Sequence, residues 1–275
     1  TIIKATPLIL TGLSVAFAFR SGLFNIGGEG QFIIGSLAAM LAGLLLKLPF
    51  IIHAFVAIAC AVIAAALWGG LSGYLKARFG VHEVISTIML NWIALYLNNF
   101  ITMLPRIKNP NSEASQKILD SARIDIFGVW KVSEQGMAWR MDHPFFHDLL
   151  KPEINIGIFI AGILAVLMSY LLKKTTLGYE LRAVGFNKDA AEVSGINVNR
   201  SFMVSMAIAG ALAGMAGAIQ VLGVSMDTVN LAAMEGFGFD ADLSQLVVER
   251  LVERFSNVRF AVLVLGHLVG PEVIR

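Results

Sequence analysis

The chain has 275 residues, of which 57% are apolar and only 15% are charged, and its formal net charge at pH 7 is +2. Soluble domains carry about 25% charged residues, so this composition argues against a soluble globular protein. The single cysteine, Cys60, lies inside an apolar run and excludes a disulfide framework or a cysteine-based metal site. We therefore predict an all-α fold, a polytopic transmembrane helical bundle.

The apolar segments follow one another along the chain. Two short ones, residues 7–19 and 31–46, come first, and longer ones follow at 51–75, 84–104, 156–172 and 202–222. Counting the short segments, about six spans are readable. If they alternate in direction, most basic residues of the short loops fall on one side, namely Arg20, Lys76, Arg78, Lys173, Lys174, Arg182, Lys188 and Arg200, and the opposite short loop carries only Lys47. The positive-inside rule makes the basic side cytoplasmic and places the long polar loop 105–153 outside the cell.

A polar, glycine-rich segment separates the first two apolar runs. Residues 24–31 read Phe-Asn-Ile-Gly-Gly-Glu-Gly-Gln, and three glycines at this density do not favour a regular helix. Two arrangements are open. The segment is irregular backbone at membrane depth with Glu29 facing the interior, or it is a tight cytoplasmic hairpin with Glu29 in water or at a helix N-terminus.

The fourth apolar segment carries a second group of polar residues. Asn91, Trp92, Tyr96 and Asn98 recur at helical spacing close to one face. Amide and aromatic groups together suit a hydroxylated, ring-bearing solute better than an ion. The alternative is hydrogen bonding between helices combined with an interfacial aromatic belt. Further on, Asp227 is either a pathway residue or a solvated loop position.

The basic loop 173–200 holds a short capped helix. Asn187 is a suitable N-cap, good helix formers follow it, and Gly195 is a suitable stop. We expect this polar helix to lie outside the bilayer and to dock against a soluble partner.

Small residues gather in the last apolar segment. Gly210 and Gly214 form a GxxxG pair, and Ala207, Ala211 and Ala218 extend the same surface. Such surfaces let helix backbones approach closely in lipid. Packing within one molecule and packing across a homo- or heterodimer interface both remain open.

No catalytic or metal-binding pattern is present in the sequence. The histidines are scattered, and Pro144 between His143 and His147 disfavours a helical metal site there. There is no G-x-x-x-x-G-K-[ST] nucleotide motif and no basic run suited to nucleic acid. We expect no metal, no cofactor and no enzymatic activity.

Four stretches of the chain, residues 7–31, 86–97, 177–185 and 187–196, resemble the membrane permeases of bacterial ABC importers for nucleosides and simple sugars. These permeases belong to the wider superfamily of ribose and branched-chain amino acid permeases. The resemblance implies a multi-pass subunit of the bacterial cell (inner) membrane without an ATPase site of its own. It implies as partners two cytosolic ABC ATPase subunits, a second permease in a homo- or heterodimer, and an extracytoplasmic solute-binding receptor.

The resemblance also implies roles for particular residues. The cytoplasmic loop would be the coupling segment to the ATPase, through Gly178, Glu180, Arg182, Gly185, Asn187, Asp189 and Gly195. The solute would pass Asn25, Glu29, Gln31, Asn91, Trp92 and Asn98. A nucleoside is the expected solute, with a simple sugar of the ribose type as the alternative. A secondary transporter without an ATPase, and a non-functional truncated permease, are further alternatives.

The family pattern stops near Asp240. We therefore separate a transmembrane permease domain, residues 1–240, from an atypical tail, residues 241–275. Residues 241–259 suit an amphipathic interfacial helix, and the apolar run 260–270 is too short to cross a bilayer. We expect a frameshift or a truncation here, with C-terminal spans missing or altered; a native tail is the alternative.

Overall fold

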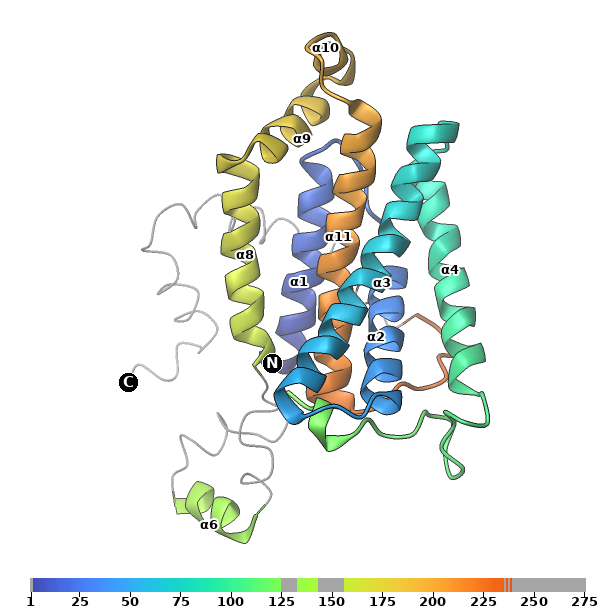
Figure 1. Cartoon of the computed structure of the whole chain (residues 1–275), viewed down its shortest axis with the longest axis vertical. Coiled ribbons are helices and arrows are strands. Elements are labelled where there is room, and N and C mark those ends of the chain that lie inside the picture. The colour runs from blue at the N-terminus through green and yellow to red at the C-terminus, as the bar shows by residue number, and fades with distance from the viewer. Residues whose placement is uncertain (1, 125–132, 143–155, 235, 237, 239–275) are drawn as a thin grey trace.

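Long helices that run alongside one another form the body of the molecule (Figure 1). The computed structural model describes residues 2–124, 133–142, 156–234, 236 and 238. The long helices are α1 (Ile2–Phe19), α2 (Gly28–Leu45), α3 (Phe50–Phe79), α4 (Glu83–Thr102), α8 (Gly157–Lys174) and α11 (Val198–Gln220). Shorter elements are η1 (Asp120–Ala122), α6 (Glu134–Asp142), α9 (Thr176–Phe186), α10 (Lys188–Val193) and the π-helical turn η2 (Val221–Ser225). The predicted all-α fold is confirmed.

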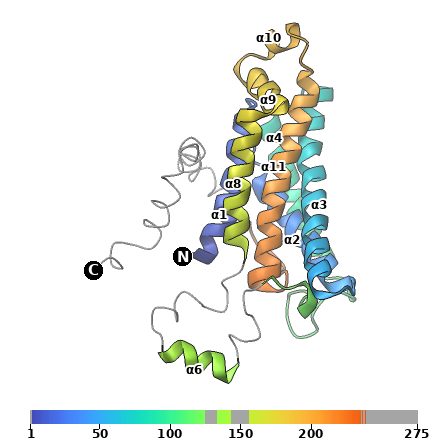
Figure 2. The same cartoon turned by 60° about the vertical axis from the view of Figure 1, so that its left-hand side comes forward.

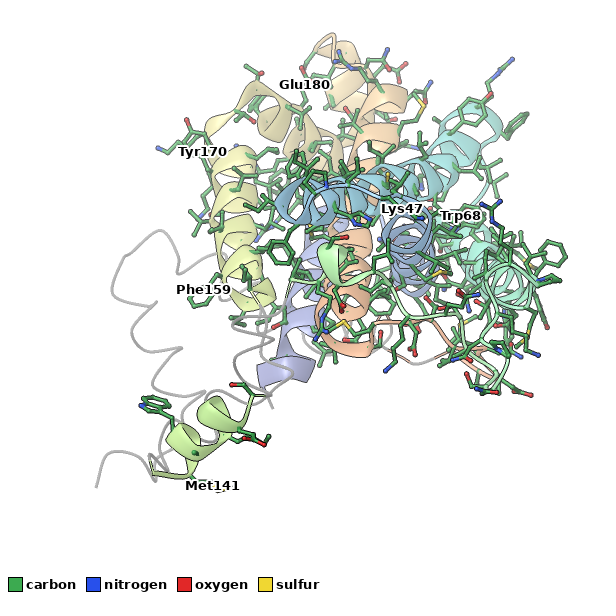
Figure 3. The ribbon with its side chains drawn as sticks, turned by 60° about the horizontal axis from the view of Figure 1, so that its bottom comes forward. Lys47, Trp68, Met141, Phe159, Tyr170 and Glu180 are labelled. Carbon is green, nitrogen blue, oxygen red and sulfur yellow. The ribbon has the colours of Figure 1, made fainter. Side chains whose placement is uncertain are left out.

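Five of these helices are long and apolar enough to cross a membrane: α2, α3, α4, α8, and α11 continued through η2. The first helix contributes a shorter apolar stretch, Ala5–Phe19. Large apolar side chains cover the outer faces of the bundle, and Figure 3 shows Phe159 and Tyr170 pointing away from it on α8. Both are more than half exposed. An apolar outer surface of this kind suits a lipid environment.

The two ends of the bundle differ in character. Figures 1 and 2 both show α9 and α10 at one end and α6 near the other. The α9–α10 end carries Lys76 and Arg78 in the last turn of α3, and Lys173 and Lys174 in the last turn of α8. Gly80, which ends α3, adopts the left-handed conformation typical of a helix C-terminus, with φ at 67°. This is the end that the charge distribution predicts to be cytoplasmic.

Small residues bring α2, α3 and α11 into close contact. A Cβ atom built on Gly210 would overlap the backbone oxygen of Ala65, and one built on Gly214 would overlap the Ala65 side chain. A Cβ built on Gly35 of α2 would overlap the backbone of Gly214. The GxxxG surface of α11 therefore packs within the molecule, which is the first of the two arrangements left open by the sequence.

The second helix begins inside the bundle rather than at its end. Gly30 donates a backbone hydrogen bond of 2.8 Å to Asn91, which lies in the middle of α4. Gln31 lies against Gly69, well inside α3. Figure 1 shows α2 starting far short of the α9–α10 end. Residues 23–27 are thus non-helical backbone inside the bundle, as the first arrangement predicts, whereas Gly28 to Gln31 belong to α2 despite their glycines. Glu29 is buried rather than in water, and it lies at the helix N-terminus that the second arrangement named.

At the opposite end, the chain after α11 is tied to the loop after α4. Backbone hydrogen bonds join Ser115 to Thr228 at 2.8 Å, Ile118 to Met226 at 2.9 Å, and Asn230 to Glu113 at 2.9 Å. Two segments that run antiparallel to each other therefore lie at this end of the bundle. His143 and His147, where no metal site is expected, and the tail 241–275 lie outside the described residues.

Candidate functional site

A buried pair of amides fixes the turn that leads into α2. Asn25 donates from Nδ2 to Gln31 Oε1 at 2.9 Å, and Gln31 donates from Nε2 to Asn25 Oδ1 at 3.1 Å. Asn25 also donates to Ser14 Oγ on α1 at 3.2 Å. Both amides are almost fully buried. Asn25 Oδ1 also accepts from the Gly27 N–H at 3.2 Å, so the bonds to Gln31, Ser14 and Gly27 use the full hydrogen-bonding capacity of Asn25.

Asn91 braces the same turn from α4. Its Oδ1 accepts from the backbone N–H of Gly30 at 2.8 Å, and its Nδ2 donates to the carbonyl of Ile26 at 3.0 Å. Buried backbone N–H and C=O groups need hydrogen-bond partners. In an irregular segment a side chain must supply the hydrogen bonds that helical backbone would otherwise form. Asn91 therefore stabilises the break between α1 and α2.

Glu29 lies in the first turn of α2 and is fully buried. Its carboxylate accepts hydrogen bonds from the backbone N–H groups of Gly236, at 3.0 Å, and Gly238. Hydrogen bonds to a carboxylate are stronger than those between neutral groups, and a helix N-terminus favours negative charge. Glu29 faces the interior, and it holds Gly236 and Gly238 against α2.

Asn98 and Asn99 hold the chain after α11 against α4. Asn99 accepts from the Leu231 N–H at 2.8 Å and donates to the Leu231 carbonyl at 2.8 Å. Asn98 donates from Nδ2 to the carbonyl of Val229 at 3.1 Å. Within the described part of the chain, Asn98 Oδ1 is buried and has no hydrogen-bond partner.

Trp92 lies apart from these buried amides. Its side chain is 47% exposed on the outer face of α4, where it stacks on Tyr96 with ring centroids 6.2 Å apart. The structure therefore brings five of the six expected pathway residues into the interior and leaves Trp92 on the surface.

A cavity of about 170 Å³ lies between α2, α4 and the end of α11. Its polar lining consists of Glu29, Ser36, Asn98, Gln220, Ser225, Asp227 and Thr228, and its apolar lining of Phe32, Ile33, Val221, Val229 and Leu231. Of the expected pathway residues only Glu29 and Asn98 line it. The sequence analysis missed Ser36, although its spacing of seven residues from Glu29 places both on one face of a helix.

Asp227 lies in the wall of this cavity, beyond the spanning part of α11. Burial raises the pKa of its carboxyl group above the ordinary value, and the positive charge of Lys117 acts in the opposite direction. Asp227 is therefore a half-buried wall residue rather than a fully solvated loop position.

The predicted coupling segment forms two short capped helices. The Thr175 hydroxyl accepts from the Gly178 N–H at 3.1 Å and caps α9. Asn187 Oδ1 accepts from the backbone N–H groups of Asp189 at 3.0 Å and Ala190 at 3.1 Å, so the predicted N-cap of α10 is confirmed. The chain leaves α10 at Gly195, whose φ of 84° favours glycine.

Two glycines seat α9 against the bundle. Gly178 packs on the last turn of α8, where an added Cβ would lie 2.6 Å from Leu172 Cα. Gly185 packs on the α1–α2 turn, where an added Cβ would overlap the Arg20 carbonyl oxygen and lie 3.1 Å from the Gly22 nitrogen. The turn contacted by α9 is thus the turn that leads to Asn25.

The remaining coupling candidates lie on or near the surface of α9 and α10. Arg182 is partly buried and donates from Nε to the Gly178 carbonyl at 3.3 Å. Glu180 is partly buried near the α9–α10 end of the bundle (Figure 3), and Asn187, Asp189 and Gly195 are exposed. Phe186 and Val193 are each 91% exposed there. Exposed apolar side chains beside polar ones are typical of a protein contact surface.

Comparison with known proteins shows to which protein family the chain belongs. Residues 1–247 match the family described as branched-chain amino acid transport system / permease component. The chain is 42% identical over 241 residues to the guanosine ABC transporter permease protein NupP of Bacillus subtilis, covering 87% of this chain and 64% of the relative. It is 36% identical over 236 residues to the nucleoside ABC transporter permease protein NupB of Lactococcus lactis, covering 85% of this chain and 61% of the relative.

A more distant relative is the ribose import permease protein RbsC of Escherichia coli, 27% identical over 216 residues, which cover 78% of this chain and 58% of the relative. The chain spans less than two thirds of the length of these relatives. No solved structure matches it. The resemblance to ABC permeases is thereby confirmed, and the chain belongs to the membrane permease family of branched-chain amino acid transport systems.

Proposed function

We propose that the full-length protein is the membrane permease subunit of an ATP-binding-cassette importer for a nucleoside. The observation that carries this proposal is the identity of 42% and 36% to two relatives described as guanosine and nucleoside ABC permeases. The identity to the ribose permease is lower, at 27%. A nucleoside therefore has better support than a simple sugar.

Cytosolic ATPase subunits are the proposed partners of α9 and α10. Three observations support this contact: the basic character of that end of the bundle, the two helix caps and the exposed Phe186 and Val193. A helix held rigidly between two spans transmits a rigid-body movement into the bundle. Gly178 and Gly185 seat α9 in direct backbone contact with α8 and with the α1–α2 turn.

A second, different permease is the proposed membrane partner. Two guanosine permease proteins of Bacillus subtilis, NupP and NupQ, resemble this chain at 42% and 27% identity. Two distinct permeases described for one solute in one organism support a heterodimer rather than a homodimer. A solute-binding receptor is proposed for the opposite, extracytoplasmic end.

Uptake into membrane vesicles tests the proposal. The full-length gene product is co-expressed with its ATPase subunits, its second permease and its receptor, and the uptake of radiolabelled guanosine is measured with ATP. We expect ATP-dependent uptake that excess unlabelled adenosine or guanosine suppresses and that excess ribose or leucine leaves unchanged. Suppression by ribose as strong as that by guanosine would instead support a simple-sugar permease, and the absence of any uptake would contradict both.

A further inference from the structure

We propose that the cavity between α2, α4 and the chain after α11 binds the solute, and that it takes a neutral ring bearing several O–H or N–H donors. This inference rests on the proposed import function. It assigns the binding site mainly to residues that the sequence analysis left aside, because Ser36, Asn98 and Thr228 line the cavity while Asn25 and Gln31 do not.

Unpartnered polar atoms in the wall are the first argument. Among the described residues, Ser36 Oγ, Asn98 Oδ1 and Thr228 Oγ1 are buried without a hydrogen-bond partner, and all three residues line this one cavity. Asn98 is fully buried and Ser36 is 5% exposed. Buried polar groups in folded proteins nearly always have partners, so these atoms need one that enters the cavity.

The neighbouring amides show why this cavity is the better site. Asn25 and Gln31 bond to each other, and Asn91 bonds to the backbone on both sides of the turn. A solute at these groups would compete with hydrogen bonds that already exist. A solute in the cavity would instead complete bonds that the protein leaves open.

The charge of the lining selects the class of solute. Among the residues that the structure describes, the lining contains the acidic residues Glu29 and Asp227 and no lysine, arginine or histidine. Lys117 acts on the Asp227 carboxyl group but does not line the cavity. A phosphate or an amino acid carboxylate would meet negative charge and no cation, and burial of an unpaired charge is costly. Neutral solutes are therefore favoured over nucleotides and amino acids.

The oxygens of the wall also favour a donor-rich solute. Carboxylate and amide oxygens accept hydrogen bonds, and hydroxyl groups can accept as well as donate. The hydroxyl groups of a sugar and the N–H edge of a purine both present several donors from one ring. Phe32, Ile33 and Leu231 supply apolar surface for the faces of such a ring.

The cavity has room for one ring of the solute, such as the sugar of a nucleoside, with the substituents of that ring. Its volume is about 170 Å³, and an apolar cavity of about 150 Å³ holds benzene. One wall has an unusual backbone, because the π-helical turn η2 supplies Val221 and Ser225 and the next residue, Met226, has a φ of 63°. π-Helical turns and left-handed non-glycine residues cluster at binding sites.

Conservative substitutions of the unpartnered hydroxyl groups test the site. Ser36→Ala and Thr228→Val remove hydroxyl groups that have no partner among the described residues. Thr102→Val is the matched control, because the Thr102 hydroxyl is also buried without a described partner but does not line the cavity. The affinity of the purified full-length transporter complex for radiolabelled guanosine is measured for each variant, together with its melting temperature and its ATP-driven uptake.

We expect Ser36→Ala and Thr228→Val each to weaken guanosine binding about threefold to tenfold, the effect of one lost hydrogen bond. Their melting temperatures should not fall, and Thr102→Val should bind as the wild type does. Equal affinity of all variants, with ATP-driven guanosine uptake intact, would overturn the site and leave the proposed function standing. Absence of uptake in the wild type would instead overturn the proposed function.

Competition tests the charge argument separately. Guanosine should displace labelled guanosine, whereas guanosine monophosphate and leucine should not, because their anionic groups find no cation in the lining. Displacement by leucine or by the monophosphate at guanosine-like concentrations would contradict the assignment to neutral solutes.

Discussion

Asn25 and Gln31 face each other across the turn before α2, and each side-chain amide donates one hydrogen bond to the other. Asn91 does the same for two backbone groups of that turn. Amides suit this task because each carries a donor and an acceptor on one small group. At the scale of single residues, these amides stabilise a break in the helices at a depth where no water is at hand.

The two members of the amide pair should depend on each other for their contribution to stability. Asn25→Ala or Gln31→Ala leaves a buried amide unsatisfied, which costs about 1–3 kcal/mol. The double variant leaves no unpaired amide side chain, although the Gly27 N–H still loses Asn25 as its acceptor, so we expect its loss of stability to be smaller than the sum of the two single losses. Thermal unfolding of the purified protein in detergent measures all three.

Asn109→Ala is the control, because Asn109 lies in the loop after α4 and its side chain bonds only locally, to the N–H of Asn111. It should unfold close to the wild-type temperature. Strictly additive losses at Asn25 and Gln31 would show that the two amides do not depend on each other.

At the scale of elements, the packing of α11 on α3 and α2 sets how closely these three helices approach one another. Gly210 and Gly214 let the α11 backbone touch Ala65, and Gly35 lets α2 approach the same surface. Close backbone contact substitutes here for the hydrophobic driving force that lipid does not provide.

Alanine at two glycines should change stability in opposite directions. Gly214→Ala places a methyl group into Ala65 and should destabilise the bundle by about 1–3 kcal/mol. Gly162→Ala on α8 meets nothing within 4 Å and should stabilise by about 0.5–1 kcal/mol, because alanine is the better helix former. Melting temperatures report both, and a rise for Gly214→Ala would contradict the close packing.

The sequence predicted where the helices lie along the chain better than it predicted which helices contact one another. The apolar runs predicted the spans, and Asn187 predicted the cap of α10, because both signals are local. The start of α2 inside the bundle did not follow, since its depth depends on contacts with Asn91 and Gly69, far along the chain. The outward position of Trp92 was missed for a similar reason: helical spacing groups residues on a face but does not say which neighbour that face meets.

The cavity could be predicted from the sequence even less well than these contacts between helices. Glu29, Asn98 and Thr228 come from three separate parts of the chain and meet only in the folded structure. No spacing in the sequence relates them. The hydrogen bonds of Glu29 to residues 236 and 238 likewise depend on the chain turning back after α11.

At the scale of the whole molecule, the coupling end and the cavity are joined through one turn. Gly185 of α9 contacts the backbone of Arg20 and Gly22, the same turn carries Asn25, and α2 continues from it to the cavity wall at Glu29 and Ser36. A displacement of α9 would therefore reach the cavity through directly packed backbone. We propose this route for coupling between ATP hydrolysis and solute movement.

The most direct test is ATP-driven guanosine accumulation in proteoliposomes that contain the complete transporter, with wild type, Gly185→Ala and Gly162→Ala compared. Gly185→Ala would push α9 off the α1–α2 turn, whereas Gly162→Ala has open space around it. The account predicts accumulation only with ATP on the α9–α10 side, a loss of at least about tenfold in Gly185→Ala with ATP hydrolysis retained, and wild-type accumulation in Gly162→Ala. Accumulation without ATP, or wild-type accumulation by Gly185→Ala, would contradict it.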